Sequence, residues 1–260
     1  MAYTRFVIIS HLRSGTHLLR TMLESHPALV CQSEVFNSDD PELPYPLSTP
    51  TREILDRWVY REFDGAIGTA GFVLQIYHPF GLKAFPGIRE NPAWGNIWQF
   101  LQAMPELRVI HLRRDNDLRR HLSHVLARET GQWHDWKPGR VDTVTHLHKP
   151  QALERGGDTR PAVRLDARRL RTDFEEVEAL HRAAERRFAD GPYRALTYEA
   201  LCEAPETLGA QLLDFLGLAP QALTPAVSRL ESRPLDQSIE NFAELRAAFQ
   251  GTPWARFFEA

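Results

Sequence analysis

The sequence predicts an α/β protein in which helices cover both faces of a mainly parallel central sheet, giving three α/β/α layers. Short apolar runs rich in β-branched residues alternate with amphipathic segments of helical spacing, which is typical of parallel sheets in α/β proteins. Hydrophobic residues make up 43% of the chain and charged residues 25%, as in ordinary globular proteins. A chain of 260 residues is long enough for one such fold with a buried core, so we expect a single domain over residues 1–260.

The N-terminal half supplies the first strands of this sheet. Residues 6–10 form a short β-branched apolar run and predict a buried strand. The helix that follows is expected to end at Pro27, because proline disfavours helical geometry in the residue before it. Residues 28–31 predict a second strand, so the chain opens with a parallel βαβ unit. The next expected elements are a proline-rich loop over 39–50, a helix over 54–63, a strand over 71–77 and a helix around 94–101.

The C-terminal half continues the alternation of strands and helices. The expected elements are a strand over 108–112, a polar helix over 116–128, a helix around 174–184, a strand over 193–198 and a helix over 205–216. Gly217 is well suited to end this last helix, because glycine readily adopts the left-handed conformation of a helix C-cap. Residues 131–161 are rich in glycine, proline, histidine and charge and predict a long loop or lid, since loops of this length are usually functional. A helical tail is expected over 219–260, with its last helix over 239–249.

The overall charge and the cysteine content narrow the functional classes. A formal net charge of -3 gives no general attraction to nucleic acid or to membrane surfaces, so we expect neither partner. No stretch is long enough to span a membrane, and the N-terminal apolar run is too short for a signal peptide. Cys31 and Cys202 read as small core residues and suit a reducing compartment. The sequence thus predicts a cytoplasmic protein without integral membrane association, whose anion sites are local.

The first local anion site is predicted directly after the first strand, over residues 10–17. Small residues there let the backbone curl around an anion, and the following helix directs its free amide groups toward it. Arg13 adds a planar, permanently charged group, while Ser14 and Thr16 add hydroxyl donors. The loop is not a Walker A motif, since it lacks the first glycine and the lysine of that pattern, which disfavours a nucleotide triphosphatase. A plain strand-to-helix turn capped by serine or threonine is the alternative.

An apolar strand followed by Arg13-Ser14-Gly15-Thr16 resembles the phosphate loop of sulfotransferases that use 3′-phosphoadenosine 5′-phosphosulfate (PAPS). The resemblance implies that these four residues and the amide of His17 hold the 5′-phosphosulfate. It also implies a sulfotransferase fold related to the P-loop NTPases, PAPS as co-substrate, adenosine 3′,5′-bisphosphate (PAP) as product and no metal requirement.

A second anion site is predicted where the strand over 108–112 ends, because Arg113 and Arg114 follow it. In the family that the chain resembles, an arginine at this strand end and a serine about two helical turns later bind the 3′-phosphate. Arg114 is aligned with that arginine and Ser123 with that serine. Arg113 is the fallback, because the spacing to Ser123 is one residue longer than in the commonest form of the motif. Three further arginines predict only a solvated helix face: Arg119, Arg120 and Arg128.

Sulfuryl transfer to a hydroxyl also requires a base that removes the hydroxyl proton. Glu34 is the candidate, since it follows the second strand, whose end is expected beside the phosphate loop. In the carbohydrate members of the family a glutamate at the matching place is the general base. His78, after the third strand, is the second choice and His17 the third. Lys83 is a candidate for contact with the bridging oxygen or a phosphate.

The acceptor of the sulfuryl group is predicted only by class. Residues 81–83, 130–133 and 241–245 resemble the bacterial branch of the family, which is similar to the trehalose and nodulation-factor sulfotransferases. That branch implies a carbohydrate, a glycolipid or another small-molecule alcohol. Four tryptophans either offer stacking faces to it or belong to the core: Trp94, Trp98, Trp133 and Trp136.

Three other readings of the sequence remain open. The first is a nucleotide or small-molecule kinase with an atypical phosphate loop, and the second is an inactive scaffold that binds PAP. The third is a metal site in the long loop, which lacks a fourth ligand at any recognised spacing. The histidines concerned are His134, His146 and His148.

Overall fold

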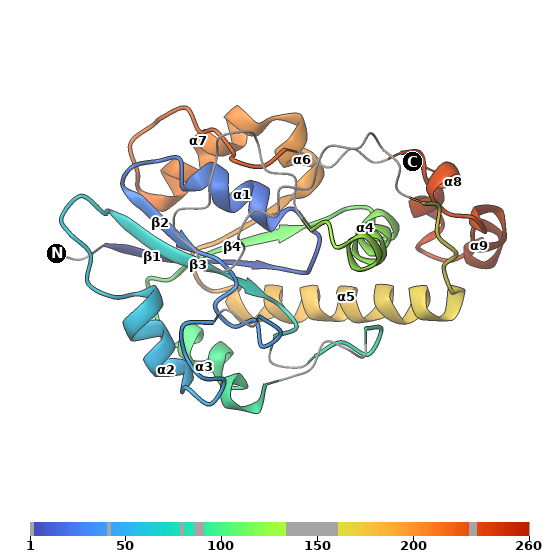
Figure 1. Cartoon of the computed structure of the whole chain (residues 1–260). Coiled ribbons are helices and arrows are strands. Elements are labelled where there is room, and N and C mark those ends of the chain that lie inside the picture. The colour runs from blue at the N-terminus through green and yellow to red at the C-terminus, as the bar shows by residue number, and fades with distance from the viewer. Residues whose placement is uncertain are drawn as a thin grey trace.

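A parallel sheet lies between two layers of helices in the computed structural model (Figure 1). The structure describes residues 3–40, 43–78, 81–85, 91–133, 161–228 and 233–259. Within these ranges the strands are β1 (Thr4–Ser10), β2 (Leu29–Gln32), β3 (Thr69–Gln75), β4 (Arg108–Arg113) and β5 (Tyr193–Thr197). They lie in the order β2-β3-β1-β4-β5, and each neighbouring pair is parallel. The three-layer α/β/α fold predicted from the sequence is confirmed.

Most of the helices agree in place with the predicted ones, and most of these differ at their ends. In the first half they are α1 (Thr16–Leu23), α2 (Thr51–Ile54), the π-helix η1 (Leu55–Val59), the 3-10 helix η2 (Pro92–Trp94), α3 (Ile97–Gln102) and α4 (Asp117–Thr130). In the second half they are α5 (Ala167–Phe188), α6 (Tyr198–Glu203), α7 (Pro205–Leu216), α8 (Leu235–Ser238), α9 (Phe242–Phe249) and the 3-10 helix η3 (Ala255–Phe258). The helix predicted over 54–63 begins at Thr51 and ends at Val59, and α6 was not predicted.

Both faces of the sheet are buried, which explains why its strands read as continuous apolar runs. Side chains alternate between the faces along each strand. Phe6 and Ile8 of β1 pack in the layer of α1, α6 and α7. Val7 and Ile9 pack on the opposite face, in the layer of α2, α3 and α5. The β1 strand therefore has an apolar environment on both faces of the sheet. The polar loop that follows it begins at its carboxyl end.

A third apolar cluster joins the C-terminal helices to α4 and α5 beyond the carboxyl ends of the strands (Figure 1). Phe174 of α5 lies at its centre and contacts the rings of Phe249, Trp254 and Phe257. The side chain of Asn116 adds a polar link, since its Nδ2 donates a 3.1 Å hydrogen bond to the carbonyl of Phe257. This cluster supports α4 from the side that faces away from the sheet.

Candidate active site

The strand order predicts where a ligand binds. β1 is the central strand, and the connections after it run to β2 and β3 on one side and to β4 and β5 on the other. In open parallel sheets, ligands bind beyond the carboxyl ends of the strands at such a reversal. The phosphate-loop segment follows β1, and the pair Arg113 and Arg114 lies at the end of β4. Both predicted anion-binding segments therefore lie at the edge of the sheet where a ligand is expected.

The backbone between β1 and α1 has two residues in the left-handed region. Arg13 has a φ of 62°, and Gly15 has a φ of 90°. A residue other than glycine is uncommon in this region, and such strained positions concentrate at functional sites. Gly15 directly precedes α1, so the helix begins without a side-chain cap and its first amide groups are available to a ligand. This geometry fits the anion-binding turn predicted from the sequence.

Tyr198 packs against this turn and leaves room only for glycine. A Cβ atom at Gly15 would lie 2.4 Å from Cδ2 of Tyr198. The same tyrosine ring lies 4.8 Å from the guanidinium carbon of Arg114. Tyr198 begins α6 at the end of β5, next to β4. It is thus a site residue that the sequence reasoning missed, although its place after a strand end was the available signal.

The loop also contains a polar atom that is suited to a ligand. Ser14 is fully buried, and within the described part of the chain its Oγ has no hydrogen-bond partner. Buried polar atoms are almost always paired in native proteins, so this hydroxyl is best explained by a partner that binds from outside the chain. Thr16 and His17 are also buried, at the start of α1. The loop can therefore enclose an anion rather than merely lie beside one.

The two predicted anion sites meet through Arg13 and Arg114. Nη1 of Arg114 donates a 3.2 Å hydrogen bond to the backbone carbonyl of Arg13. Nε of Arg13 donates one of 3.1 Å to Oγ of Ser123 on α4. Arg113 instead forms an ion pair with Glu185 of α5 and is partly exposed. The structure thus brings Arg13, Arg114 and Ser123 together, and it places Arg113 outside this group.

Glu34 lies in the loop after β2, but not directly beside the phosphate loop. The expectation that the end of β2 borders this loop is wrong, because β3 lies between β2 and β1. Gln75, the last residue of β3, bridges the gap: its Nε2 donates a 2.5 Å hydrogen bond to Oε1 of Glu34. A weaker contact of 3.4 Å joins Nδ2 of Asn37 to Oε2. The carboxylate is therefore held in place at the carboxyl ends of the strands.

His78 and Lys83 differ in exposure. His78 is buried, and this burial lowers its pKa to about 3, so the imidazole is neutral at physiological pH. Lys83 is exposed, and its backbone amide donates a 2.9 Å hydrogen bond to Oε1 of Glu176 on α5.

His124 is another buried imidazole, it lies near Arg13, and the sequence reasoning missed it. Its ring lies 4.2 Å from that of Phe85 and 5.8 Å from that of Trp133, measured between ring centroids. Trp133 is 40% exposed, and the guanidinium carbon of Arg13 lies 5.6 Å from its ring centroid. Of the three candidate stacking tryptophans that the structure describes, Trp133 is thus the one placed beside the loop. Trp94 and Trp98 are core residues, and position 136 lies outside the described residues.

The arginines of α4 do not form a solvated face as predicted. Arg128 is exposed, but Arg119 is partly buried and Arg120 is fully buried. The prediction failed because the partners of Arg120 lie mostly on other elements, where the local helical pattern cannot show them.

Arg120 is the centre of a buried polar network behind the phosphate loop. Its Nε donates a 2.7 Å hydrogen bond to Asp117, and its Nη2 donates one to Asp173 of α5. Its Nη1 lies 3.2 Å from Nδ1 of His11, which follows β1. His121 also contacts Asp173, at 2.9 Å. The network joins α4, α5 and the start of the phosphate loop.

The buried histidines make the stability of the protein depend on pH. Burial lowers the pKa values of His78, His111 and His124 to about 3, and neighbouring arginine charges add to the effect for the last two. In the unfolded chain each imidazole has a pKa of about 6.5. Below that pH the unfolded state binds more protons than the native state, so the free energy of unfolding falls as the pH falls.

We expect a loss of about 2 kcal/mol for each of these histidines between pH 7 and pH 5. Urea unfolding across this range measures the slope. The variant His124→Phe removes one titrating group and should flatten the slope. A free energy of unfolding that stays constant down to pH 5 would contradict the assignment of neutral, buried imidazoles.

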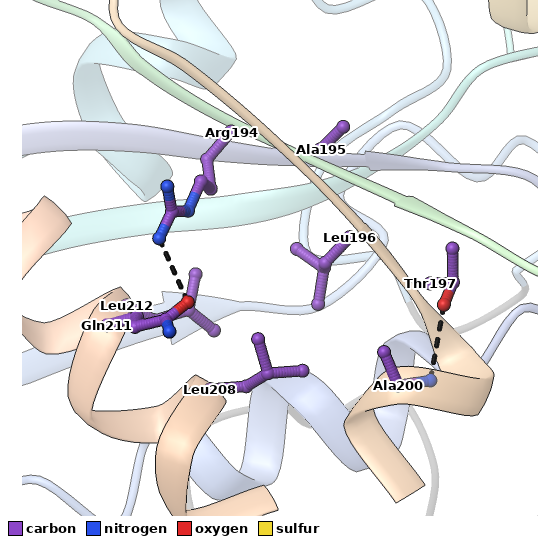
Figure 2. Close-up of a pocket in the computed structure, with 8 residues that line it drawn as sticks. All are labelled: Arg194, Ala195, Leu196, Thr197, Ala200, Leu208, Gln211 and Leu212. Atoms are coloured by element: carbon purple, nitrogen blue, oxygen red, sulfur yellow. Dashed lines mark hydrogen bonds between the residues drawn. The ribbon is translucent and has the colours of Figure 1, made fainter. Parts of the chain in front are cut away.

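A pocket that neither Arg13 nor Arg114 lines lies between β5 and the helices α6 and α7 (Figure 2). Leu196, Leu208 and Leu212 give it an apolar lining. Figure 2 shows Arg194 at its rim, where Nη2 donates a 2.9 Å hydrogen bond to Gln211. The phosphate-loop residues do not line it, so we do not assign it to the anion site.

Within the described residues, no three His, Cys, Asp or Glu side chains gather as they would around a metal ion. Histidines 134, 146 and 148 of the predicted long loop lie outside the described residues. Among the residues that the structure describes, no helix combines the length and the apolar character needed to cross a membrane.

Comparison with known proteins identifies the family. The model of the sulfotransferase family matches residues 5–222. Nodulation protein H of Rhizobium meliloti is 30% identical over 261 residues, which span 98% of this chain and 94% of that protein. Nodulation protein H of Rhizobium tropici is 30% identical over 258 residues, spanning 98% and 92%.

A crystal structure of a sulfotransferase from Alicyclobacillus acidocaldarius has a similar fold. Its TM-score is 0.50 at 16% identity, and the match covers 100% of this chain and 95% of that one. The resemblance seen in the phosphate loop is confirmed by the family match, which spans most of the chain. The chain belongs to the sulfotransferase family and is a sulfotransferase enzyme.

Proposed function

We propose that the enzyme transfers a sulfuryl group from PAPS to a hydroxyl of a carbohydrate, a glycolipid or another small-molecule alcohol. The observation that carries the proposal is the junction of Arg13, Arg114 and Ser123 at the carboxyl ends of β1 and β4. A nucleotide with anionic groups on both its 5′ and its 3′ positions requires cationic groups on two neighbouring strand ends. Arginine suits this task, because its planar guanidinium matches the oxygens of phosphate and sulfate.

The residues of the phosphate loop fit the 5′-phosphosulfate end of such a donor. The buried hydroxyl of Ser14 and the tight turn at Gly15 leave a place for an oxyanion. We assign Arg13, Ser14, Gly15, Thr16 and the amide of His17 to this end. PAPS supplies the activated sulfuryl group when it is bound.

Arg114 and Ser123 are assigned to the 3′-phosphate. Arg114 is preferred to Arg113 for this role, because its Nη1 contacts the carbonyl of Arg13 in the phosphate loop, whereas Arg113 is paired with Glu185 of α5. Lys83, whose side chain is exposed, is assigned to contact with the anionic groups of the donor.

Glu34 is proposed as the general base that removes the proton of the acceptor hydroxyl. The protein otherwise contributes positioning and charge neutralisation, by analogy with phosphoryl transfer. His78 is less suited to the role, since burial lowers its pKa to about 3 and a group of such low basicity is a poor proton acceptor at neutral pH.

Thermal unfolding with added nucleotides tests donor binding. PAP should raise the melting temperature more than ATP or AMP at equal concentration, because a ligand stabilises the state to which it binds. Arg114→Ala should weaken PAP binding by about 2 kcal/mol, or roughly thirtyfold, through loss of charge-assisted hydrogen bonds. Arg113→Ala is the matched control and should retain the PAP effect, because its partner is Glu185.

Other outcomes of this test support the alternatives. A larger effect of ATP than of PAP favours a kinase with an atypical loop. Stabilisation by PAP without any transfer favours an inactive scaffold. Incubation with radiolabelled PAPS and a metabolite extract then identifies the acceptor.

We also propose a cytoplasmic location. It is supported by Cys31 and Cys202, which form no disulfide, as is usual in a reducing compartment.

A further inference from the structure

Gln75 lies between the proposed base, Glu34, and the strand that leads into the phosphate loop. It is the last residue of β3, the strand that lies between β2 and β1. Its side chain is buried, at 1% exposure, and its Nε2 donates the 2.5 Å hydrogen bond to Oε1 of Glu34. On its other side Gln75 is in register with Ser10, which is the last residue of β1. Gln75 therefore contacts the loop that carries Glu34 through its side chain and pairs with the end of β1 through its backbone.

The direction of the Gln75 side chain follows from the alternation along β3. Val73 belongs to the core cluster that includes Leu19 and Met22 of α1. Residues two apart on a strand share a face, so Gln75 also lies on the α1 side of the sheet. The phosphate loop leads into α1 on this side. The hydrogen bond thus holds Glu34 on the face of the sheet where the phosphate loop turns.

The orientation of the amide is fixed by its partner. A carboxylate can only accept hydrogen bonds, so the amide nitrogen of Gln75 must face Glu34 and the carbonyl oxygen must face away. This Oε1 is buried, and no residue in the described part of the chain donates to it. Among the described residues, Glu34 therefore determines the orientation of this amide.

We propose that Gln75 is a positioning residue for sulfuryl transfer, which fixes the carboxylate of Glu34 toward the phosphate loop. The proposal rests on the proposed role of Glu34 as the base. A hydrogen bond to a charged carboxylate favours the charged form, so Gln75 keeps Glu34 ready to accept a proton at neutral pH. It also removes the rotational freedom of the carboxylate, which reduces the entropy lost on reaching the reactive arrangement.

The test is the pH dependence of turnover in two variants and a matched control. Release of PAP from PAPS is measured from about pH 5 to pH 9, with trehalose, with glucose and with water alone as acceptors. Gln75→Glu keeps the size of the side chain but places two carboxylates together, which raises the apparent pKa of the pair. The acidic limb of its rate profile should move up by about one pH unit or more. Gln75→Leu should lower kcat by about tenfold or more, with little change in KM.

Ser33→Ala is the control, since Ser33 is as buried as Gln75 and adjoins Glu34 in sequence. It should leave the pH profile unchanged, and all three variants should retain stabilisation by PAP. The proposal is overturned if Gln75→Glu has the wild-type profile, or if Ser33→Ala shifts it equally. The variant Glu34→Gln distinguishes a failure of the role proposed for Gln75 from a failure of the role proposed for Glu34. If Glu34→Gln is inactive while both Gln75 variants are normal, the role of Gln75 alone is wrong; if Glu34→Gln is active, the base assignment is wrong as well.

Discussion

Replacing Glu34 by glutamine should slow sulfuryl transfer by roughly a hundredfold or more, because the variant cannot accept the proton of the acceptor hydroxyl. The change preserves the local structure, since a glutamine carbonyl at position 34 can still accept the hydrogen bond that Gln75 donates to Oε1. Donor binding should also persist, because Arg13 and Arg114 are unchanged. Steady-state kinetics with radiolabelled PAPS measures the loss, and it should appear in kcat rather than in the affinity for the donor.

Two control measurements test whether the loss of activity reflects the role of Glu34 as the base. The increase in melting temperature caused by PAP must be the same in Glu34→Gln and in the wild type, which shows that the donor site is intact. His78→Ala is the second comparison, because burial already makes this imidazole a weak base, and its kcat should stay within a few-fold of the wild type. Full turnover in Glu34→Gln together with a collapse in His78→Ala would transfer the role to the histidine.

Replacing Asp173 by alanine should destabilise the fold by about 3–5 kcal/mol, since it leaves the buried guanidinium of Arg120 without its most buried carboxylate partner. Both side chains are fully buried. Burial alone would raise the pKa of Asp173, but Arg120 and the hydrogen bond with His121 hold it well below its usual range. A carboxylate with a lowered pKa contributes its stability above the unfolded pKa of about 4 and loses it as the pH falls below that value. The deficit of Asp173→Ala should therefore be the same at pH 6 and at pH 8.

Urea unfolding measures this deficit, and an exposed ion pair supplies the control. Arg164 and Glu244 contact each other at 2.7 Å, but their side chains are 62% and 65% exposed. Glu244→Ala should cost less than about 1 kcal/mol, because water screens such pairs. Asp173→Asn keeps the shape and one acceptor and should fall between the other two variants. Equal deficits in Asp173→Ala and Glu244→Ala would show that the buried network is not important for stability.

The fold could be predicted from the sequence because both faces of the sheet are buried. Residues 6–10 then form an uninterrupted apolar run, and a local pattern of this kind predicts a strand without knowledge of its neighbours. The order of the strands could not be predicted in this way. β3 inserts between β1 and β2, and so Glu34 lies one strand farther from the phosphate loop than expected. The short helix α6 was missed because it begins directly at the end of β5, where Thr197 accepts the capping hydrogen bond from Ala200.

Some residues of the candidate site could likewise be predicted from sequence motifs, and others could be found only in the structure. Arg13 and Ser14 belong to one continuous motif, and Arg114 and Ser123 belong to another, so both groups could be predicted from the resemblance of these motifs to those of the family. Tyr198, Gln75 and His124 reach the site through tertiary packing, and the place of Tyr198 after a strand end is the one local signal among them. Arg120 illustrates the limit most clearly. Its helical context predicts exposure, yet it is buried against a carboxylate of α5, a helix that lies far away in the sequence.

The hydrogen bond between Asn116 and Phe257 links η3 to the beginning of α4, and through it to the nucleotide site. The side-chain oxygen of Asn116 caps the helix that carries Ser123, by accepting a 3.0 Å hydrogen bond from the amide of Arg119. Its nitrogen is at the same time bound to the carbonyl of Phe257. Proteolysis or a fusion that displaces this turn would therefore destabilise the beginning of α4. An enzyme changed in this way should bind the nucleotide more weakly.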